Sequence, residues 1–390
     1  MNAAKSQPAD HKGIVASLFL VSNRPQNITA LLDNIEATVS DPRAVEVLIK
    51  VDEGDRASVD RALREEQRRP FSVRALVSPP PANHFELWRS LNDLFKMIDP
   101  SAYFVSNIND EVRFLSKGWD AVLRQHIGAF PDHLFRLRCS RFKLRNYFDI
   151  WECWYAPENF GFHTKRWVDV QGDWNACHVS DAFQQCVAFY LSLGSYPGAF
   201  QTQRDIPIWG IEMGGQEAAE GLTAEQLESR NQGNDRAWYR IMSPEMQTEI
   251  CRRARLIQAH IWLHEHGHQE FELRDIPNRR RIEIYDRSGD CLIVYSYRVD
   301  EDKIRADLER ERQKGEQFHF RQDLNFINDT ANFLGPTDGE YVDRVFHTSR
   351  TPGPTSGTEE ASPATARPES RSRRRGLRAV ARRILRGGPR

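Results

Sequence analysis

The sequence contains no long hydrophobic run, no pair of closely spaced cysteines, no internal repeat and almost no net charge (−1). Its first apolar run, residues 14–21, has only the length of a strand and follows polar residues, so we expect neither a signal peptide nor a membrane-spanning helix. Six cysteines without a CxxC motif are typical of reduced, mostly buried thiols in a chain of 390 residues. We therefore expect a cytoplasmic protein, and 39% hydrophobic residues suffice for the core of one large or two ordinary domains.

Segments typical of strands and helices alternate through the first 120 residues. Strands are predicted at 14–23, 44–52, 71–78 and 103–105, and helices at 25–35, 55–67 and 85–98. This alternation predicts an α/β protein with a mostly parallel, right-handed, doubly wound sheet, in which ligands bind beyond the carboxyl ends of the strands. Asn23, Asp52 and Asp110 follow such ends.

The second half of the chain predicts a helical and β-hairpin extension. Helices are predicted at 223–242, 244–268 and 302–317, and a hairpin at 280–299 with its turn at Ser288 and Gly289. We accordingly divide the chain into a main domain at 12–210, an accessory region at 211–349, a linker at 350–370 and a basic tail at 371–390.

Two adjacent acids, Asp110 and Glu111, follow the apolar strand at 103–105 within the run Asn-Asp-Glu. Carboxylate oxygens are hard ligands that suit Mn2+ or Mg2+, ions that are often shared with substrate phosphates. The alternative is a solvated acidic turn, which an acidic pair after a strand usually forms.

Four segments occur in an order that resembles a known family: residues 21–35, 48–55, 109–120 and 178–185. The sequence is similar to the nucleotide-sugar-dependent glycosyltransferases of GT-A fold, in particular to the large inverting bacterial family. The resemblance implies a GT-A-like (Rossmann-like) main domain and divalent-metal-dependent, inverting transfer of a sugar from a nucleoside diphosphate sugar to a hydroxyl of a glycan or lipid-linked acceptor.

The same resemblance implies the nucleotide-binding residues. Ser22, Asn23 and Arg24, which close the first strand, would lie against the nucleotide, and Asp52 would accept a hydrogen bond from its base. Asp110 would bind the ribose.

The metal and the base are implied in the same way. Asp110 and Glu111 would bind Mn2+ or Mg2+, with His178 as a further ligand or a diphosphate contact, although His178 could equally be a structural histidine. Asp181, near the start of a helix, would be the catalytic base, and helix capping is its alternative role. The family usually has two aspartates where this chain has Asn-Asp-Glu, so a catalytically inactive nucleotide-sugar-binding protein of the same fold is an alternative function.

An aromatic region at 151–174 contains four tryptophans. Rings of this kind stack on sugars, so Trp151, Trp154 and Trp174 are candidates for acceptor binding, with burial in the core as the alternative.

A competing motif occurs at His264, Glu265 and His268, which match HExxH. On a continuous helix this motif binds zinc and predicts a zinc-dependent hydrolase. Gly267 within the motif indicates instead that the helix ends there, where histidines are favoured by the helix dipole without any metal.

The end of the chain changes in composition. Residues 350–370 are rich in Pro, Ser, Thr and Gly and predict a disordered linker. In residues 371–390 apolar side chains recur at helical spacing among arginines, which predicts a basic amphipathic helix on an anionic membrane, with the protein peripheral at the inner membrane face. Nucleic-acid contact and a disordered basic tail are the alternatives; no aromatic residue interleaves with the arginines, so we expect no nucleic-acid partner.

Overall fold

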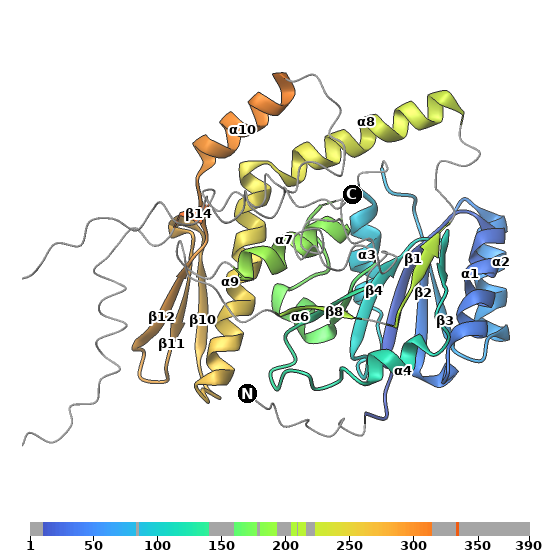
Figure 1. Ribbon diagram of the computed structural model, residues 1–390, viewed down its shortest axis with the longest axis horizontal. Helices are drawn as coiled ribbons and strands as arrows, with labels where there is room; N and C mark the ends of the chain where they lie inside the picture. Colours follow the sequence, from blue (N-terminus) through green and yellow to red (C-terminus); the bar gives the residue numbers. More distant parts are fainter. Residues whose placement is uncertain are drawn as a thin grey trace, which may run out of the picture. The chain divides into compact units, whose positions relative to one another are not determined.

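The computed structural model describes residues 11–82, 86–139, 160–177, 180–192, 204–208, 210–215, 223–313 and 333–334. Its largest sheet has the strand order β3-β2-β1-β4-β7-β6-β8 (Figure 1). These strands are β1 (Ala16–Val21), β2 (Val45–Asp52), β3 (Ser72–Ser78), β4 (Phe104–Ile108), β6 (Arg136–Cys139), β7 (Phe162–Thr164) and β8 (Asp205–Ile208). β1 pairs in parallel with β2 and β4, β2 with β3 and β6 with β8, whereas β7 is antiparallel to β4 and β6. The predicted α/β class with a mostly parallel sheet is confirmed.

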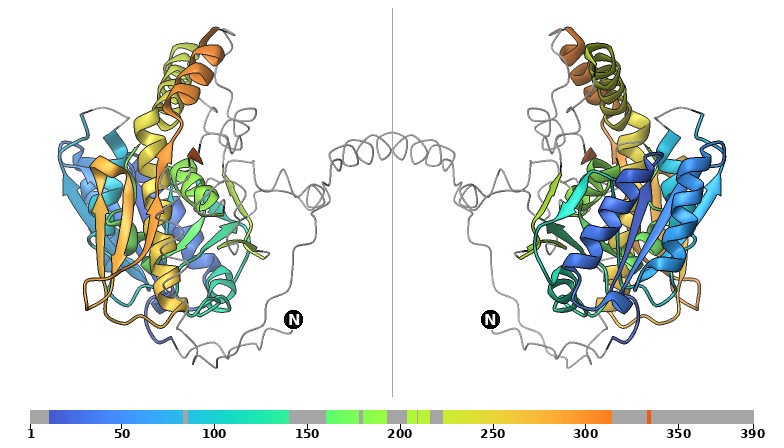
Figure 2. Two further views of the ribbon diagram at one scale, coloured as in Figure 1. Left: turned by 90° about the vertical axis from the view of Figure 1, so that its left-hand side faces the viewer. Right: turned by 90° about the vertical axis from the view of Figure 1, so that its right-hand side faces the viewer.

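Both faces of the sheet are covered because successive strand residues point to opposite sides. Leu18 and Leu20 of β1 pack in one core cluster with α1 (Pro25–Thr38), while Phe19 packs in the other with α3 (Leu87–Phe95). α1 and α2 (Arg56–Arg68) lie along the same face, in front of the sheet in the right-hand view of Figure 2. The helices on opposite faces confirm the doubly wound arrangement.

The second core cluster extends beyond the sheet. It includes α6 (Lys165–Gln171), α7 (Ser180–Ser192), the long helix α9 (Pro244–Glu265) and an antiparallel sheet of three strands. This sheet has β10 (Glu272–Ile276), β11 (Arg281–Tyr285) and β12 (Cys291–Ser296) in that order. β11 and β12 form the predicted hairpin, and Gly289 in its turn has φ 83°. One core therefore joins the large sheet to the extension, and the division at residue 210 stays a prediction.

The remaining described elements are short or peripheral. They are α4 (Trp119–Arg124), α8 (Ala224–Ile241), α10 (Glu301–Gln313), β5 (Val112–Phe114), β9 (Met213–Gly215), β13 (Arg298–Val299), β14 (Phe333–Leu334) and 3-10 helices at Pro42–Ala44 and Pro277–Arg279. α8, α9 and α10 confirm the predicted helices of the second half. Among the residues described, no helix has the length and apolarity needed to cross a membrane. The predicted linker and basic tail lie outside the described residues.

Candidate functional site

The carboxyl ends of three neighbouring parallel strands, β1, β2 and β4, lie side by side at one edge of the sheet. Ser22 follows β1, Asp52 ends β2, and Asp110 comes two residues after β4. The Ser22 N–H donates to the Lys50 carbonyl at 3.2 Å, which fixes the end of β1 against β2. The fold thus brings the predicted residues of these three segments to one edge, where open α/β sheets bind their ligands.

Asp110 is held at this edge by hydrogen bonds to both of its oxygens. Its side chain is only 4% exposed. Ser22 Oγ donates to Asp110 Oδ2 at 2.5 Å, and Arg24 Nε donates to the same oxygen at 2.9 Å. Arg24 Nη2 donates to Oδ1, so the guanidinium grips the carboxylate with two parallel bonds.

Arg24 also reaches the second acid of the pair. Its Nη1 donates to Glu111 Oε1 at 2.8 Å, while the Glu111 N–H donates to Asn109 Oδ1 at 3.2 Å. Partial burial lowers the pKa of Arg24, but its hydrogen bonds to Asp110 and Glu111 raise the pKa by more, so the net shift is upward. Arg24 is therefore a permanent cation, and its side chain is 45% exposed.

The backbone holds Arg24 in place at the start of α1. Its N–H donates to Ser22 Oγ at 3.1 Å, and its carbonyl accepts from the N–H groups of Asn27 and Ile28 at 3.0 and 3.1 Å. Pro25 is the first residue of α1, where a missing N–H costs nothing and the fixed φ favours the helix. Ser22, Arg24, Asp110 and Glu111 are called the strand-end cluster below. Asn23 is exposed beside it.

Asp52 lies at the same edge but has a different partner. It forms an ion pair with the ammonium group of Lys50, whose side chain is 1% exposed, while that of Asp52 is 27% exposed. Lys50 was not among the predicted site residues. Because side chains two positions apart in a strand share a face, a lysine two residues before Asp52 was the sequence signal that could have found it.

The predicted Mn2+ or Mg2+ site has a different chemistry in the structure. Both oxygens of Asp110 and one of Glu111 already accept from Arg24, so a divalent ion would have to displace a cation. Among the residues that the structure describes, no group of three or more His, Cys, Asp or Glu is placed to hold a metal. His178, the predicted third ligand, lies outside them. As they lie, the residues present do not fit a resident divalent ion.

The helix of the predicted base is α7, which starts at Ser180, with Asp181 as its second residue. The Asp181 side chain lies outside the described part of the chain, so its role stays a prediction. The inward face of α7 is confirmed, since Phe183, Val187 and Tyr190 are buried.

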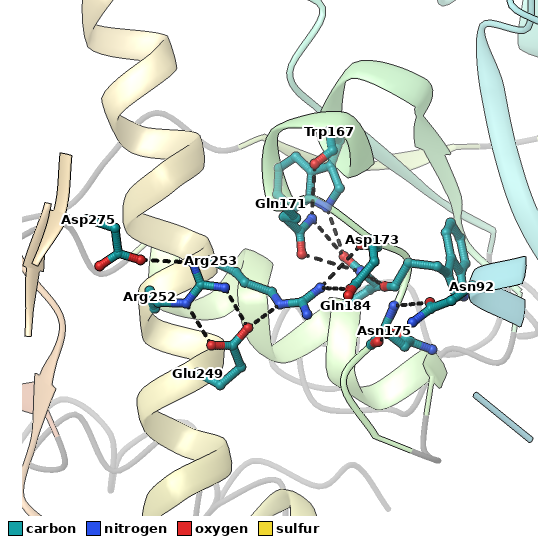
Figure 3. A network of polar contacts seen from close by, with 11 residues as sticks. Asn92, Trp167, Gln171, Asp173, Asn175, Gln184, Glu249, Arg252, Arg253 and Asp275 are labelled. Atoms are coloured by element: carbon teal, nitrogen blue, oxygen red, sulfur yellow. Dashed lines mark hydrogen bonds and ion pairs between the residues drawn. The ribbon is translucent and has the colours of Figure 1, made fainter. Parts of the chain in front are cut away.

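Gln184 fixes α7 against α6 (Figure 3). Its Oε1 accepts from Trp167 Nε1 at 2.9 Å and from Gln171 Nε2 at 3.2 Å, and its Nε2 donates to the Trp174 carbonyl. The buried Asn92 and Asn175 in the same network exchange two hydrogen bonds of 2.9 Å. The amino-terminal half of α7 is therefore anchored through its interior face.

Trp174 belongs to the core and not to a sugar-binding surface. Its exposed fraction is 0%, and its ring meets Phe19 at 5.4 Å and His163 at 5.0 Å, edge to face. The alternative of core burial is thus correct for Trp174. Trp151 and Trp154 lie outside the described residues.

The HExxH motif does not form the helical zinc site. α9 ends at Glu265, and Gly267 has φ 68°, so His264 and His268 do not occupy successive turns of one helix. The His268 ring stacks instead on Trp262 at 5.1 Å, and Glu265 forms an ion pair with Arg204 at 3.5 Å. The zinc-hydrolase alternative loses the geometry on which it depended.

Comparison with known proteins finds solved structures that this chain resembles. No protein-family model and no curated protein matches it. The structure is similar to the mannosyltransferase PcManGT from Pyrobaculum calidifontis in complex with GDP-Man and Mn2+, with 9% identity over 88% of this chain and 90% of that one and a TM-score of 0.44. It is also similar to S. aureus TarS 1-349 in complex with UDP-GlcNAc, with 9% identity over 73% and 99% of the two chains and a TM-score of 0.39. At these identities and TM-scores the similarity assigns no family, activity, donor or metal to this chain.

Proposed function

We propose that this protein is a nucleotide-sugar-dependent glycosyltransferase. The observation that carries the proposal is the convergence of Ser22, Arg24, Asp52 and Asp110 at the carboxyl ends of β1, β2 and β4. A nucleoside diphosphate has a base and a ribose that need acceptors and phosphates that need a cation. This edge offers both kinds of group within one line of neighbouring strands.

Each residue has a chemically suitable role in the proposal. Asp52 is partly exposed and keeps a carboxylate oxygen for an N–H of the base while Lys50 holds the other side of the group. Asp110 and Ser22 lie beside the ribose, and the half-exposed Arg24 faces the diphosphate. Positioned charges of this kind stabilise the charge that develops on a leaving group.

The reaction that we propose is a direct displacement. The acceptor hydroxyl oxygen attacks the anomeric carbon, the bond from that carbon to the diphosphate oxygen breaks with its electrons going to the diphosphate, and the hydroxyl proton passes to Asp181. One displacement inverts the anomeric centre. Asp181 near the start of α7, which Gln184 anchors, supports this assignment.

The acceptor that we propose is a glycan or lipid-linked hydroxyl at an anionic membrane surface. Support comes from the sequence of residues 371–390, where arginines flank apolar residues at helical spacing.

The test is a panel of nucleotide sugars, scored for slow donor hydrolysis and for transfer, with Asp181→Asn as the key variant. Because a general base typically contributes 10²–10⁴-fold, we expect turnover to fall by about that factor while the dissociation constant for the donor changes little. The matched control is Asp169→Asn on α6, whose carboxylate pairs with Lys165 at 2.7 Å. Full turnover by Asp181→Asn would remove Asp181 as the base. Tight nucleotide binding without turnover of any donor would instead support the inactive binding protein.

A further inference from the structure

We propose that Arg24 supplies the positive charge at the donor diphosphate, so that this protein binds its nucleotide without a divalent cation. The inference rests on the proposed function and specifies its donor site. In this proposal the Arg24 side chain takes the role of the divalent metal that the sequence predicts at Asp110 and Glu111.

The first reason is that the guanidinium already occupies the position of an ion between the two acids. It donates to both oxygens of Asp110, through Nε at 2.9 Å and through Nη2, and to Glu111 Oε1 at 2.8 Å. A divalent ion on the same oxygens would lie in contact with a cation that cannot lose its proton. Either Arg24 or the ion can hold this place, but not both.

The second reason is that Arg24 is fixed there from two directions. The Asp110 carboxylate that receives it is almost fully buried and also accepts from Ser22 at 2.5 Å. The backbone of Arg24 is tied to Ser22 Oγ and to the first turn of α1. Expelling Arg24 would leave the buried Asp110 charge without its cation, which is strongly unfavourable.

The third reason is that Arg24 keeps capacity for a ligand. A guanidinium has five N–H groups, and three of them donate within the strand-end cluster. This leaves two, on a side chain that is 45% exposed. The planar arrangement of these donors suits bidentate binding to phosphate oxygens.

The two acids have unequal roles in this arrangement. Asp110 is gripped by two hydrogen bonds from Arg24, whereas Glu111 is held by one. We infer that the incoming diphosphate takes the place of Glu111 as the partner of Nη1, while Asp110 continues to hold the guanidinium. α1 begins next to Arg24 and has no acidic residue in its first turn, so its amino-terminal dipole also favours the anion.

The experiment measures binding of UDP, GDP, ADP and CDP to the full-length chain by calorimetry, once in EDTA and once in Mn2+. We expect the nucleotide that binds to do so with dissociation constants within about threefold in the two conditions. Arg24→Ala should weaken binding in EDTA by at least about tenfold, equivalent to 1.4 kcal/mol. Because this variant uncovers Asp110 and Glu111, Mn2+ should restore part of its affinity, an effect that a merely structural arginine would not produce.

Two more variants keep the test decisive if Arg24→Ala does not fold. Arg24→Lys retains the charge but loses the planar, bidentate arrangement of N–H donors. We expect it to bind the nucleotide more weakly than the wild type in EDTA. Glu111→Gln should bind at least as tightly as the wild type, whereas a metal ligand lost in this way would weaken binding. Arg43→Ala is the control, since Arg43 is exposed and pairs with Asp41 at the surface.

Each outcome bears on a different statement. Nucleotide binding that requires Mn2+ or Mg2+ in the wild type, with Glu111→Gln weakened, would overturn the role of Arg24 and leave the proposed transferase intact. Binding that is independent of metal and lost in the Arg24 variants supports both. Failure of every nucleotide to bind, with or without metal, would overturn both.

Discussion

Two groups of charged residues in this protein are built around arginines that form ion pairs with carboxylates. They differ in how much of the arginine side chain remains exposed to solvent. The strand-end cluster holds Arg24 with a side chain 45% exposed, at the edge where three parallel strands end. The second group, which we call the helix cluster, consists of Glu249, Arg252 and Arg253 on α9 with Asp173 and Asp275 (Figure 3). Its Arg253 has a side chain only 4% exposed.

The helix cluster joins separate segments to α9. Arg253 pairs with Glu249 at 2.7 Å and with Asp173 at 2.6 Å, and it lies over the Phe183 ring of α7 at 5.0 Å. Arg252 pairs with the same glutamate and with Asp275 of β10. The enclosed Arg253 thus connects α9 to α7 and to the segment after α6, and Arg252 connects α9 to β10, whereas the half-exposed Arg24 can still contact a ligand. Similar ion pairs thus serve stability in one region and, in our proposal, ligand binding in the other.

The largest effect that we expect is on stability, from Arg253→Ala. The substitution removes a buried cation from Glu249 and Asp173, and breaking a buried ion pair typically costs about 3–5 kcal/mol. Because Glu249 keeps its pair with Arg252, we expect the free energy of unfolding to fall by about 3 kcal/mol, at the lower end of that range. Urea denaturation measures the change. Arg305→Ala is the control, since the exposed Arg305 pairs with Glu301 one turn away and should contribute less than about 0.5 kcal/mol. A loss equal to that of the control would remove the distinction between the two clusters.

The pH dependence of this loss follows from Glu249. Burial raises the pKa of Glu249, but its hydrogen bond to Arg252 and the charges of Arg253 and Arg252 lower it by more, so the net pKa lies below the ordinary 4.5. A group with a lowered pKa stabilises the folded state above its unfolded pKa and loses that contribution as the pH falls through the folded value. The difference between wild type and Arg253→Ala should therefore be full at neutral pH and shrink below about 4.5.

A smaller effect, on binding, is expected at Asp52, which combines a buried partner with a partly exposed carboxylate. Asp52→Ala would leave the buried Lys50 without its anion and would mix lost stability with lost affinity. Asp52→Asn also removes the charge but keeps an oxygen that accepts a hydrogen bond from Lys50, so we expect nucleotide affinity to fall about tenfold with a smaller loss of stability than in Asp52→Ala. Calorimetry and urea denaturation separate the two quantities. Unchanged affinity would exclude Asp52 from the nucleotide site and confine the binding role to the strand-end cluster.

Sequence predicts the strand-end region well because its signals are local. Buried runs such as those ending at Val21 and Asp52 give strands, Pro25 and Asp55 mark helix starts, and parallel strands bring their ends together automatically. What Arg24 does with Asp110 and Glu111 could not be predicted, because these residues are 86 and 87 positions apart and only the sheet order makes them neighbours.

Interior contacts set the other limits of prediction. A tryptophan that binds sugar and a tryptophan that packs in a core look the same in a sequence. For Trp174 the contacts with Phe19 and His163 show that it packs in the core. β10 was missed because its residues alternate weakly and mostly remain exposed or half-buried, so no buried face appears in the sequence.

The smallest effect is expected at the end of α9. His264, Glu265 and His268 are close in sequence there but do not form a common site in the structure, so this region serves as a third case beside the two clusters. His264→Ala should change the free energy of unfolding by less than about 0.5 kcal/mol and leave nucleotide affinity unchanged, since the side chain is exposed. His266→Ala, at the neighbouring ring that stacks on Trp262 at 4.3 Å, is the control. Elemental analysis of the purified protein provides the decisive readout. Stoichiometric zinc that is lost in His264→Ala but kept in His266→Ala would mean that the chain rearranges beyond Glu265 to bring His268 beside His264, and it would restore the zinc-hydrolase hypothesis.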